Sequence, residues 1–267
     1  MARESLQAIG ERYGSDKFTV HRFGPVYERY FEPIRDRPLR LLEIGIGGEG
    51  HSPGGESLLT WQEYFPEATI VGIDIHDKSH VVGERIRTEV CDQSDQSALR
   101  EVWSRHGGFD IIIDDGSHRS HDVLLSLFGL LNLMGEGGIY VIEDTQTGYW
   151  PHYGGTSVRQ DYRETSTTWL KLFIDCVNRT EILWRDHPAV RSGFAISEAH
   201  FHRNIALVVK GDVAPSNVLT PEVRDQWLRD DLAAAGIDGA LAHDLSEAGF
   251  REKLLRLVRA LRQADLL

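Results

Sequence analysis

Strand-like and helix-like patterns alternate along the chain from Leu39 onward, and this alternation constrains the fold more than any other feature. The strand-like runs are continuously apolar, as in FDIIIDD and GIYVIED, instead of alternating apolar with polar residues. Such strands have both faces buried, which is typical of a parallel sheet covered by helices on each side. The sequence therefore predicts an α/β fold that is Rossmann-like, doubly wound and mostly parallel.

The rest of the chain suggests three segments. Two closely spaced runs, FAISEAHFHRN and IALVVKG, are expected to close the sheet with an antiparallel last strand. We predict an N-terminal helical segment over residues 1–38, a Rossmann-like domain over 39–211 and a helical C-terminal extension over 212–267. The extension ends in an amphipathic pattern in which Phe250, Leu254 and Leu261 share one face. That face suits a core stripe, with a subunit contact as the alternative.

Composition excludes several partners. The 267 residues carry a formal net charge of -12, which repels a phosphate backbone and argues against nucleic acid. Cys91 and Cys176 lack CxxC spacing, and the N-terminus lacks the apolar core of a signal peptide, so a cytoplasmic protein is expected. The longest apolar stretch, LLSLFGLLNLM, is too short to cross a bilayer, so no membrane partner is expected.

Two acidic stretches end two of the predicted strands. Asp114 and Asp115 begin DDGSH, and Glu143 with Asp144 ends the run GIYVIED. The carboxyl ends of parallel strands meet at one edge of a sheet, where ligands bind. Four carboxylates crowded there require a cation, or a proton held by a raised pKa. His118 adds a candidate general base to the same corner.

A glycine-rich loop follows the first strand and contains GxGxxG at Gly45, Gly47 and Gly50. The loop continues through Pro53, which makes it too long for the pyrophosphate of a dinucleotide. Glu43, just ahead of the glycines, suits a cationic aminoacyl group and would repel phosphate. A plain glycine turn without a ligand is the alternative.

Polar residues also follow the next two strands. Asp74 ends the second strand, from which a carboxylate can hold ribose hydroxyls, and Asp92 with Gln93 follows the third and suits an adenine edge. Each residue alone is more simply a strand-end cap. Their occurrence at successive strand ends favours a nucleoside with an amino-acid tail.

The motifs YGSDK, LLEIGIGG, VGIDI, DQSD, FDIIIDDGSH and GGIYVIEDT resemble class I S-adenosylmethionine-dependent methyltransferases. More narrowly, they are similar to the metal-dependent deoxysugar O-methyltransferases of macrolide and other natural-product pathways, over about residues 13–145. Several of those enzymes carry a long domain before YGSDK, whereas here the motif begins at Tyr13. That difference leaves open any oligomer built by such a domain.

The resemblance implies a seven-stranded sheet and an N-terminal segment that covers the cofactor. It implies Mg²⁺ held by Asp115, Glu143 and Asp144, with His118 as general base and Asp114 in a supporting role. The cofactor-binding positions that it implies are Tyr13, Ser15, Glu43, Gly45, Gly47, Ser57, Asp74, Asp92, Gln93 and Asp115.

We therefore expect an S-adenosylmethionine- and Mg²⁺-dependent O-methyltransferase that methylates a sugar hydroxyl of a small-molecule glycoside, and a homo-oligomer. Residues 148–166, rich in Gly, Tyr and His, are expected to form a substrate loop or lid. The alternatives are a catechol-type phenol O-methyltransferase, a nucleotide-binding oxidoreductase and a cofactor-binding module without catalysis.

Overall fold

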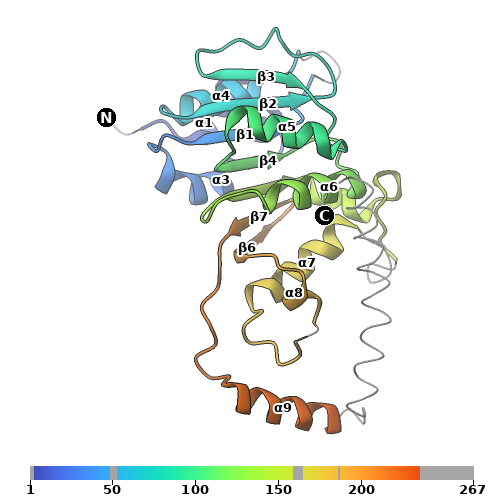
Figure 1. Ribbon diagram of the computed structural model, residues 1–267. Coiled ribbons are helices and arrows are strands. Elements are labelled where there is room, and N and C mark those ends of the chain that lie inside the picture. The colour runs from blue at the N-terminus through green and yellow to red at the C-terminus, as the bar shows by residue number, and fades with distance from the viewer. Residues whose placement is uncertain (1–2, 49–52, 159–164, 186, 235–267) are drawn as a thin grey trace.

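The computed structural model describes residues 3–48, 53–158, 165–185 and 187–234. Its centre is a seven-stranded sheet in the order β3-β2-β1-β4-β5-β7-β6 (Figure 1). The strands are β1 (Arg40–Ile44), β2 (Thr69–Asp74), β3 (Ile86–Val90), β4 (Ile111–Asp114), β5 (Ile139–Glu143), β6 (Ile196–His202) and β7 (Ile205–Lys210). The first five pair in parallel, and β7 pairs antiparallel with both β5 and β6. The predicted fold class is confirmed, including the antiparallel last strand.

Helices cover both faces of the sheet (Figure 1). One core cluster joins one face to α5 (Gln96–His106), α6 (Ser120–Leu131) and α7 (Ser166–Val177). The other cluster joins the opposite face to α1 (Leu6–Tyr13), α3 (Gly24–Phe31) and α4 (Glu56–Tyr64). Because apolar side chains leave water on both faces, β4 and β5 at the centre of the sheet are buried along their whole length, as their unbroken apolar sequences predicted.

Local sequence explains where these helices begin and end. In α5, the Asp95 side chain accepts from the backbone N–H groups of Ser97 and Ala98, which satisfies donors that have no partner within the helix. The helix ends at Gly107, whose φ of 70° is in the left-handed region that favours glycine. Such capping aligns α5 so that Leu99 and Val102 face the sheet.

The remaining elements lie at the ends of the domain. The short helices are α2 (Asp16–Thr19), η1 (Glu32–Ile34), η2 (Thr145–Tyr149), η3 (Pro151–Tyr153) and α8 (Pro188–Arg191). The helix α9 (Pro221–Ala234) lies far from the sheet and has no buried residue (Figure 1). The predicted terminal helix at Phe250 to Leu261 lies outside the described residues. Within the described part of the chain, no helix combines the length and apolar character needed to cross a bilayer.

The strand register brings the predicted polar residues to one edge. Ile44 at the end of β1 pairs with Ile73 of β2 and with Asp114 of β4, and Asp114 pairs with Ile142 of β5. The carboxyl ends of β1, β2, β4 and β5 are therefore level. The glycine loop and both acidic stretches leave the sheet at this edge.

Candidate active site

The turn after β1 and the turn after β4 pack backbone against backbone. Asp115 donates its N–H to the carbonyl of Ile44 at 2.9 Å, while Gly45 donates to Ile73 at 2.8 Å. A Cβ on Gly45 would lie 2.3 Å from the Asp115 carbonyl oxygen, and its φ is 77°. Only glycine fits that position, because both the space and the backbone conformation exclude a side chain. The first loop glycine thus fixes where Asp115 emerges.

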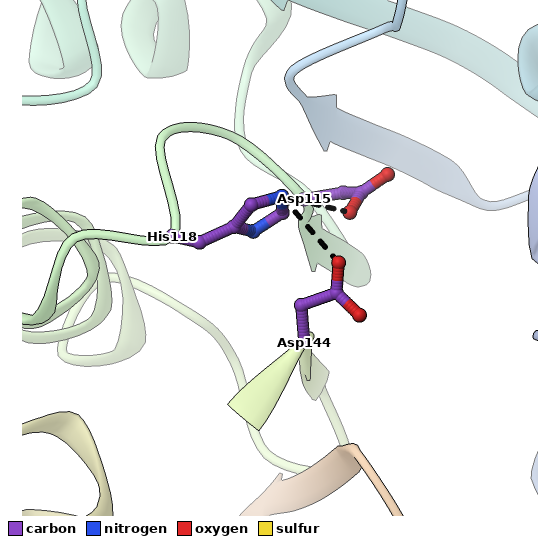
Figure 2. A group of neighbouring side chains, drawn as sticks. All are labelled: Asp115, His118 and Asp144. Atoms are coloured by element: carbon purple, nitrogen blue, oxygen red, sulfur yellow. Dashed lines mark ion pairs between the residues drawn. The ribbon is translucent and has the colours of Figure 1, made fainter. Parts of the chain in front are cut away.

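Asp115, His118 and Asp144 form a group at this edge that could hold a metal ion (Figure 2). One ligand atom from each residue lies within 4.8 Å of the others. The Nε2 atom of His118 is 3.5 Å from Oδ2 of Asp144 and 3.9 Å from Oδ1 of Asp115. All three side chains are partly exposed, so a ligand can reach them. On the far side of Asp144, Nδ1 of His21 is 3.8 Å from Oδ1.

Two members of this group have unusual backbones. His118 has a φ of 55° and Asp144 a φ of 50°, in the left-handed region that non-glycine residues seldom adopt. Each such residue costs roughly 1–2 kcal/mol relative to a right-handed conformation. Strain of this kind gathers at functional sites, where the surrounding structure enforces it. Here it turns both side chains toward the same space.

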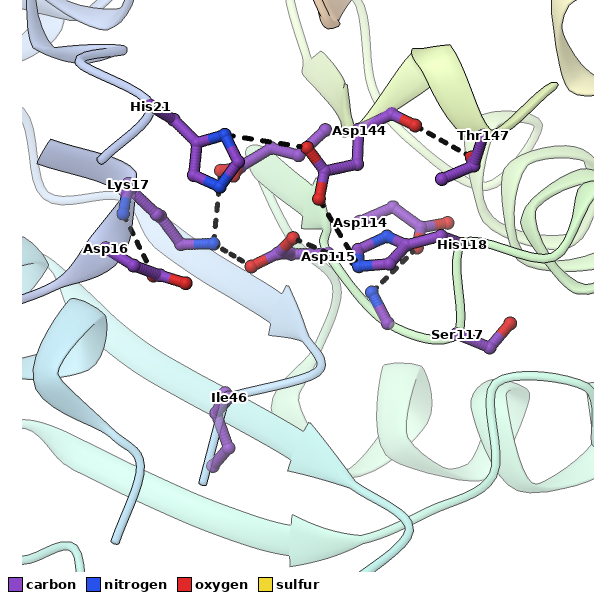
Figure 3. A network of polar contacts seen from close by, with 12 residues as sticks. Asp16, Lys17, His21, Ile46, Asp114, Asp115, Ser117, His118, Asp144 and Thr147 are labelled. Carbon is purple, nitrogen blue, oxygen red and sulfur yellow. Dashed lines mark hydrogen bonds and ion pairs between the residues drawn. The ribbon is translucent and has the colours of Figure 1, made fainter. Parts of the chain in front are cut away.

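A second, buried group contains the ε-ammonium of Lys17, which lies on the other side of Asp115 from His118 (Figure 3). Lys17 Nζ contacts a carboxylate oxygen of Asp115 and lies 3.2 Å from Oε1 of Glu43 and 3.2 Å from Oε1 of Glu143. Its side chain is only 3% exposed. A buried cation therefore compensates part of the crowded negative charge, in addition to the metal or proton that the sequence suggested.

Aromatic residues complete the hydrogen bonding of the buried group. Tyr27 of α3 donates its hydroxyl to Glu143. Trp61 of α4 donates its indole N–H to Oε2 of Glu43 at 2.8 Å. Each of these two carboxylates is thus fixed by a side chain from a helix, Glu143 by α3 and Glu43 by α4.

The electrostatics of the buried group follow from one cation facing three carboxylates. Burial disfavours the charged ammonium, but Asp115, Glu143 and Glu43 together outweigh it and raise the pKa of Lys17 well above its ordinary value. Burial raises the pKa of Glu143 well above its usual range. The positive charge of Lys17 offsets this rise only in part, because the negative charge of Asp115 raises the pKa of Glu143 further. Glu43 and Asp115 likewise have raised pKa values, caused chiefly by burial.

Asp114 supports the turn from inside the core. Its carboxylate accepts from the hydroxyl of Tyr140 at 3.1 Å, from the side-chain amide of Gln93 at 3.1 Å, and from Ser126. The side-chain oxygen Oε1 of Gln93 also accepts a hydrogen bond from the backbone N–H of Ser117, at 2.5 Å. With its acceptors occupied and only 1% exposed, Asp114 points away from the partly exposed group.

The predicted nucleoside positions lie at the ends of β2 and β3, although their contact with a cofactor stays a prediction. Asp74 accepts from the N–H groups of Ile46 at 3.2 Å and His76 at 2.9 Å, which ties its carboxylate to the loop. Asp92 is exposed beyond β3 and accepts from Ser94 at 2.8 Å. Gly47 accepts from Lys78 Nζ at 2.6 Å.

The N-terminal predicted positions are less open. Tyr13 donates its hydroxyl to Glu63 at 2.8 Å, while Ser15 precedes α2 and is 4% exposed. Ser57 in the first turn of α4 is 6% exposed, and Glu43 is fully buried. Their contact with a cofactor stays a prediction.

The structure does not bring all predicted site residues into one group, and it adds residues to the site that the sequence analysis missed. Asp144 and Asp115 lie close to His118, whereas Glu143 points into the buried group with Lys17, and the roles given to these residues stay predictions. Lys17 and His21 were missed as site residues, although Lys17 ends the YGSDK motif. Tyr27 carries no functional signal in the sequence, because aromatic residues on an amphipathic helix ordinarily indicate packing.

The expected lid is described only in part. Tyr153 of η3 lies beside His118, with 6.4 Å between ring centroids, and its ring is 6.1 Å from that of Trp150. Tyr162 lies outside the described residues. The described part of this loop therefore borders the exposed group.

The chain is similar in sequence and fold to known proteins, although no protein-family model matches it. It is 40% identical over 207 residues to 8-demethyl-8-alpha-L-rhamnosyl tetracenomycin-C 2'-O-methyltransferase of Streptomyces olivaceus, covering 77% of this chain and 54% of the relative. It is 41% identical over 214 residues to mycinamicin VI 2''-O-methyltransferase of Micromonospora griseorubida, covering 78% and 53%. The chain thus spans about half the length of these relatives.

A solved structure agrees. The MycE methyltransferase of the mycinamycin pathway, in complex with Mg, SAH and mycinamycin VI, superposes with a TM-score of 0.73 at 40% identity, over 82% of this chain and 57% of MycE. Together with the sheet order and the acidic strand ends, this similarity defines the fold of a class I, S-adenosylmethionine-dependent methyltransferase. Within that class, the chain is a homologue of the deoxysugar O-methyltransferases of the tetracenomycin and macrolide pathways.

Proposed function

We propose that this protein is an S-adenosylmethionine- and Mg²⁺-dependent O-methyltransferase that methylates a sugar hydroxyl of a natural-product glycoside. The observation that carries the proposal is the partly exposed group of Asp115, His118 and Asp144 beside the glycine loop. The names of the relatives, which specify sugar 2' and 2'' hydroxyls, support the acceptor class.

The residues at this edge of the sheet suit both Mg²⁺ and S-adenosylmethionine. Carboxylate oxygens are the ligands that Mg²⁺ prefers, and two carboxylates converge on one space at the edge of the sheet. We propose that Asp115 and Asp144 hold the ion, with Glu143 as the third carboxylate. In the described part of the glycine loop, a Cβ on Gly47 would meet only the Cα of Gly54, at 3.7 Å, which leaves room for a nucleoside cofactor beside the loop backbone.

The proposed chemistry needs an oxygen nucleophile. When bound, Mg²⁺ lowers the pKa of a coordinated hydroxyl, and the sulfonium cofactor supplies the methyl group. His118 is positioned to accept the hydroxyl proton, because its Nε2 faces the space between Asp115 and Asp144. Asp144 would then stabilise the imidazolium at a separation of 3.5 Å.

Replacing His118 tests this role. General-base catalysis typically contributes about 100- to 10,000-fold to the rate, so His118→Ala should lower kcat by roughly that factor. Binding of S-adenosylhomocysteine should change little. The matched control is His121→Ala, because His121 lies three residues further along and its side chain is 75% exposed. Equal activity of the two variants on a sugar acceptor would contradict the assignment.

Acceptor class can be separated with the same variant. A phenol has a pKa near 10 and needs less activation than an alkyl hydroxyl. On a catechol acceptor, His118→Ala should therefore lose less activity than on a rhamnoside. Wild-type turnover of catechol alone, with none on any deoxysugar glycoside, would replace the sugar proposal with the phenol alternative.

Cofactor and metal are tested by calorimetric titration. The wild-type chain should bind S-adenosylmethionine and S-adenosylhomocysteine but not NAD, and should lose activity in EDTA and regain it with Mg²⁺. Tight NAD binding without binding of either sulfur cofactor would favour the oxidoreductase alternative. Full activity in EDTA would contradict the metal requirement while leaving the methyltransferase intact.

A further inference from the structure

Lys17 is the buried cation of the site, and two of its three carboxylate partners are proposed metal ligands. Nζ contacts Asp115 and lies 3.2 Å from Oε1 of Glu143. The third partner is Glu43, also at 3.2 Å. The lysine comes from α2, which is distant in sequence from the strands that supply the carboxylates. A positive charge of the protein itself therefore bears on the oxygens to which a metal ion would bind.

We propose that Lys17 is a positioning residue that acts as an internal counter-cation: it holds the carboxylates together in the metal-free protein and weakens Mg²⁺ binding by repelling the ion. The inference rests on the proposed Mg²⁺ site and deepens it. Lys17 acts through Asp115 and Glu143 and not on a substrate.

Two observations support the stabilising half of the proposal. Glu43 is fully buried and Glu143 is 3% exposed, so water cannot compensate their charge. Neutral donors reach them, Trp61 for Glu43 and Tyr27 for Glu143, but hydrogen bonds from neutral groups add no positive charge. Because isolated buried charges are costly, removing the lysine leaves a strongly repelling cluster.

The repulsive half follows from Coulomb's law. An ammonium in contact with Asp115 lies within a few ångströms of any ion bound to that carboxylate, and the screening there is weak because Lys17 is 2% exposed. The lysine and the metal therefore compete for the negative charge of the same oxygens. The site tolerates loss of the metal and binds it less tightly than the carboxylates alone would.

The experiment compares the wild-type chain with the variant Lys17→Met, in which methionine has a similar volume and no charge. Mg²⁺ is titrated into EDTA-stripped protein by calorimetry, and Tm is measured in EDTA and in Mg²⁺. The matched control is Lys78→Met, because Lys78 is also buried but donates to the Gly47 carbonyl, not to a carboxylate. If Lys17→Met folds poorly, Lys17→Gln supplies an uncharged side chain that retains hydrogen bonding.

Lys17→Met should lower Tm in EDTA by roughly 10 °C and lower the Kd for Mg²⁺ by about tenfold or more, so that Mg²⁺ restores most of the lost Tm. The double variant Lys17→Met/Glu43→Gln removes one charge of each sign and should return both values toward the wild type. Lys78→Met should leave the Kd for Mg²⁺ unchanged.

A lower Tm with unchanged or weaker Mg²⁺ binding would overturn the inference, because a lysine with a merely structural role gives that result. Absence of Mg²⁺ binding by the wild type would instead contradict the proposed metal site itself. The two failures are therefore distinguished by the wild-type titration alone.

Discussion

At the scale of single residues, the site depends on backbone positions that most side chains cannot occupy. His118 and Asp144 adopt left-handed conformations, and Gly45 lies against the backbone of Asp115. These positions place the exposed group and the glycine loop within reach of each other. Glycine is required at position 45 for two separate reasons, the backbone conformation and the lack of space for a Cβ. Gly14 has the same conformation without the crowding, so a comparison of the two positions separates these two effects.

We expect Gly45→Ala to destabilise the protein more than Gly14→Ala. Both glycines have nearly the same φ, 77° and 79°, so both substitutions incur the left-handed cost of roughly 1–2 kcal/mol. A Cβ on Gly14 meets nothing within 4 Å, whereas one on Gly45 meets the Asp115 carbonyl oxygen at 2.3 Å. The clash should add about 1–3 kcal/mol.

Urea denaturation measures the difference between these variants, and calorimetry should show weaker S-adenosylhomocysteine binding for Gly45→Ala alone. Equal free energies of unfolding would mean that the two turns separate without cost. In that case Gly45 would not be what fixes Asp115.

At the scale of elements, the N-terminal helices serve the site as well as the core. In α3, Tyr27 donates to Glu143, and one turn later the Tyr30 hydroxyl lies 3.0 Å from Nε2 of His202. Two tyrosines of one helix therefore bind different strands. They differ in burial and in partner, because Tyr27 faces a buried carboxylate and Tyr30 a partly exposed imidazole.

Tyr27→Phe should lower the free energy of unfolding by about 1.5–3 kcal/mol, because it leaves a buried carboxylate with one donor fewer. Tyr30→Phe is the control from the same helix and should cost about 0.5–1.5 kcal/mol, as expected for a hydrogen bond between neutral groups. Urea denaturation in EDTA, where no metal can replace the lost donor, makes the comparison. A larger loss for Tyr30→Phe would show that Glu143 does not depend on α3.

At the scale of the whole molecule, burial controls the chemistry of groups that the proposed reaction does not use. Cys91 and Cys176 are both buried, and burial raises the pKa of each thiol from 9.0 to about 11. Between these values the folded protein keeps both thiol protons while the unfolded chain has released them. Unfolding then releases protons, so a rise in pH favours the unfolded state.

We therefore expect the stability contributed by the two neutral thiols to be fully present below pH 9 and to be lost as the pH rises toward about 11. Chemical denaturation at intervals across this range measures the fall. The double variant Cys91→Ala/Cys176→Ala should show a shallower fall, because alanine does not titrate. Identical slopes for the two proteins would show that the thiols keep ordinary pKa values when folded.

The sequence by itself determined the sheet, its helices and the edge at which the site lies. Unbroken apolar runs such as the one ending at Asp114 require burial on both faces, and strands of that kind place their following loops at a common edge. The convergence of the two acidic stretches, DDGSH and Glu143 with Asp144, at one edge follows from those two facts. Local sequence patterns were enough to predict these strands, because each apolar run contains the pattern that indicates a buried strand.

Only the tertiary structure decided what compensates the buried carboxylates. Lys17 and Tyr27 come from helices that precede the sheet in the chain, and Glu143 turns toward them while its neighbour Asp144 turns toward His118. Adjacent residues at a strand end face opposite directions. The packing of α2 and α3 decides which of the two carboxylates, Glu143 or Asp144, contacts the lysine. That packing is a long-range property, set by apolar burial across the sheet and not by the residues nearby in sequence.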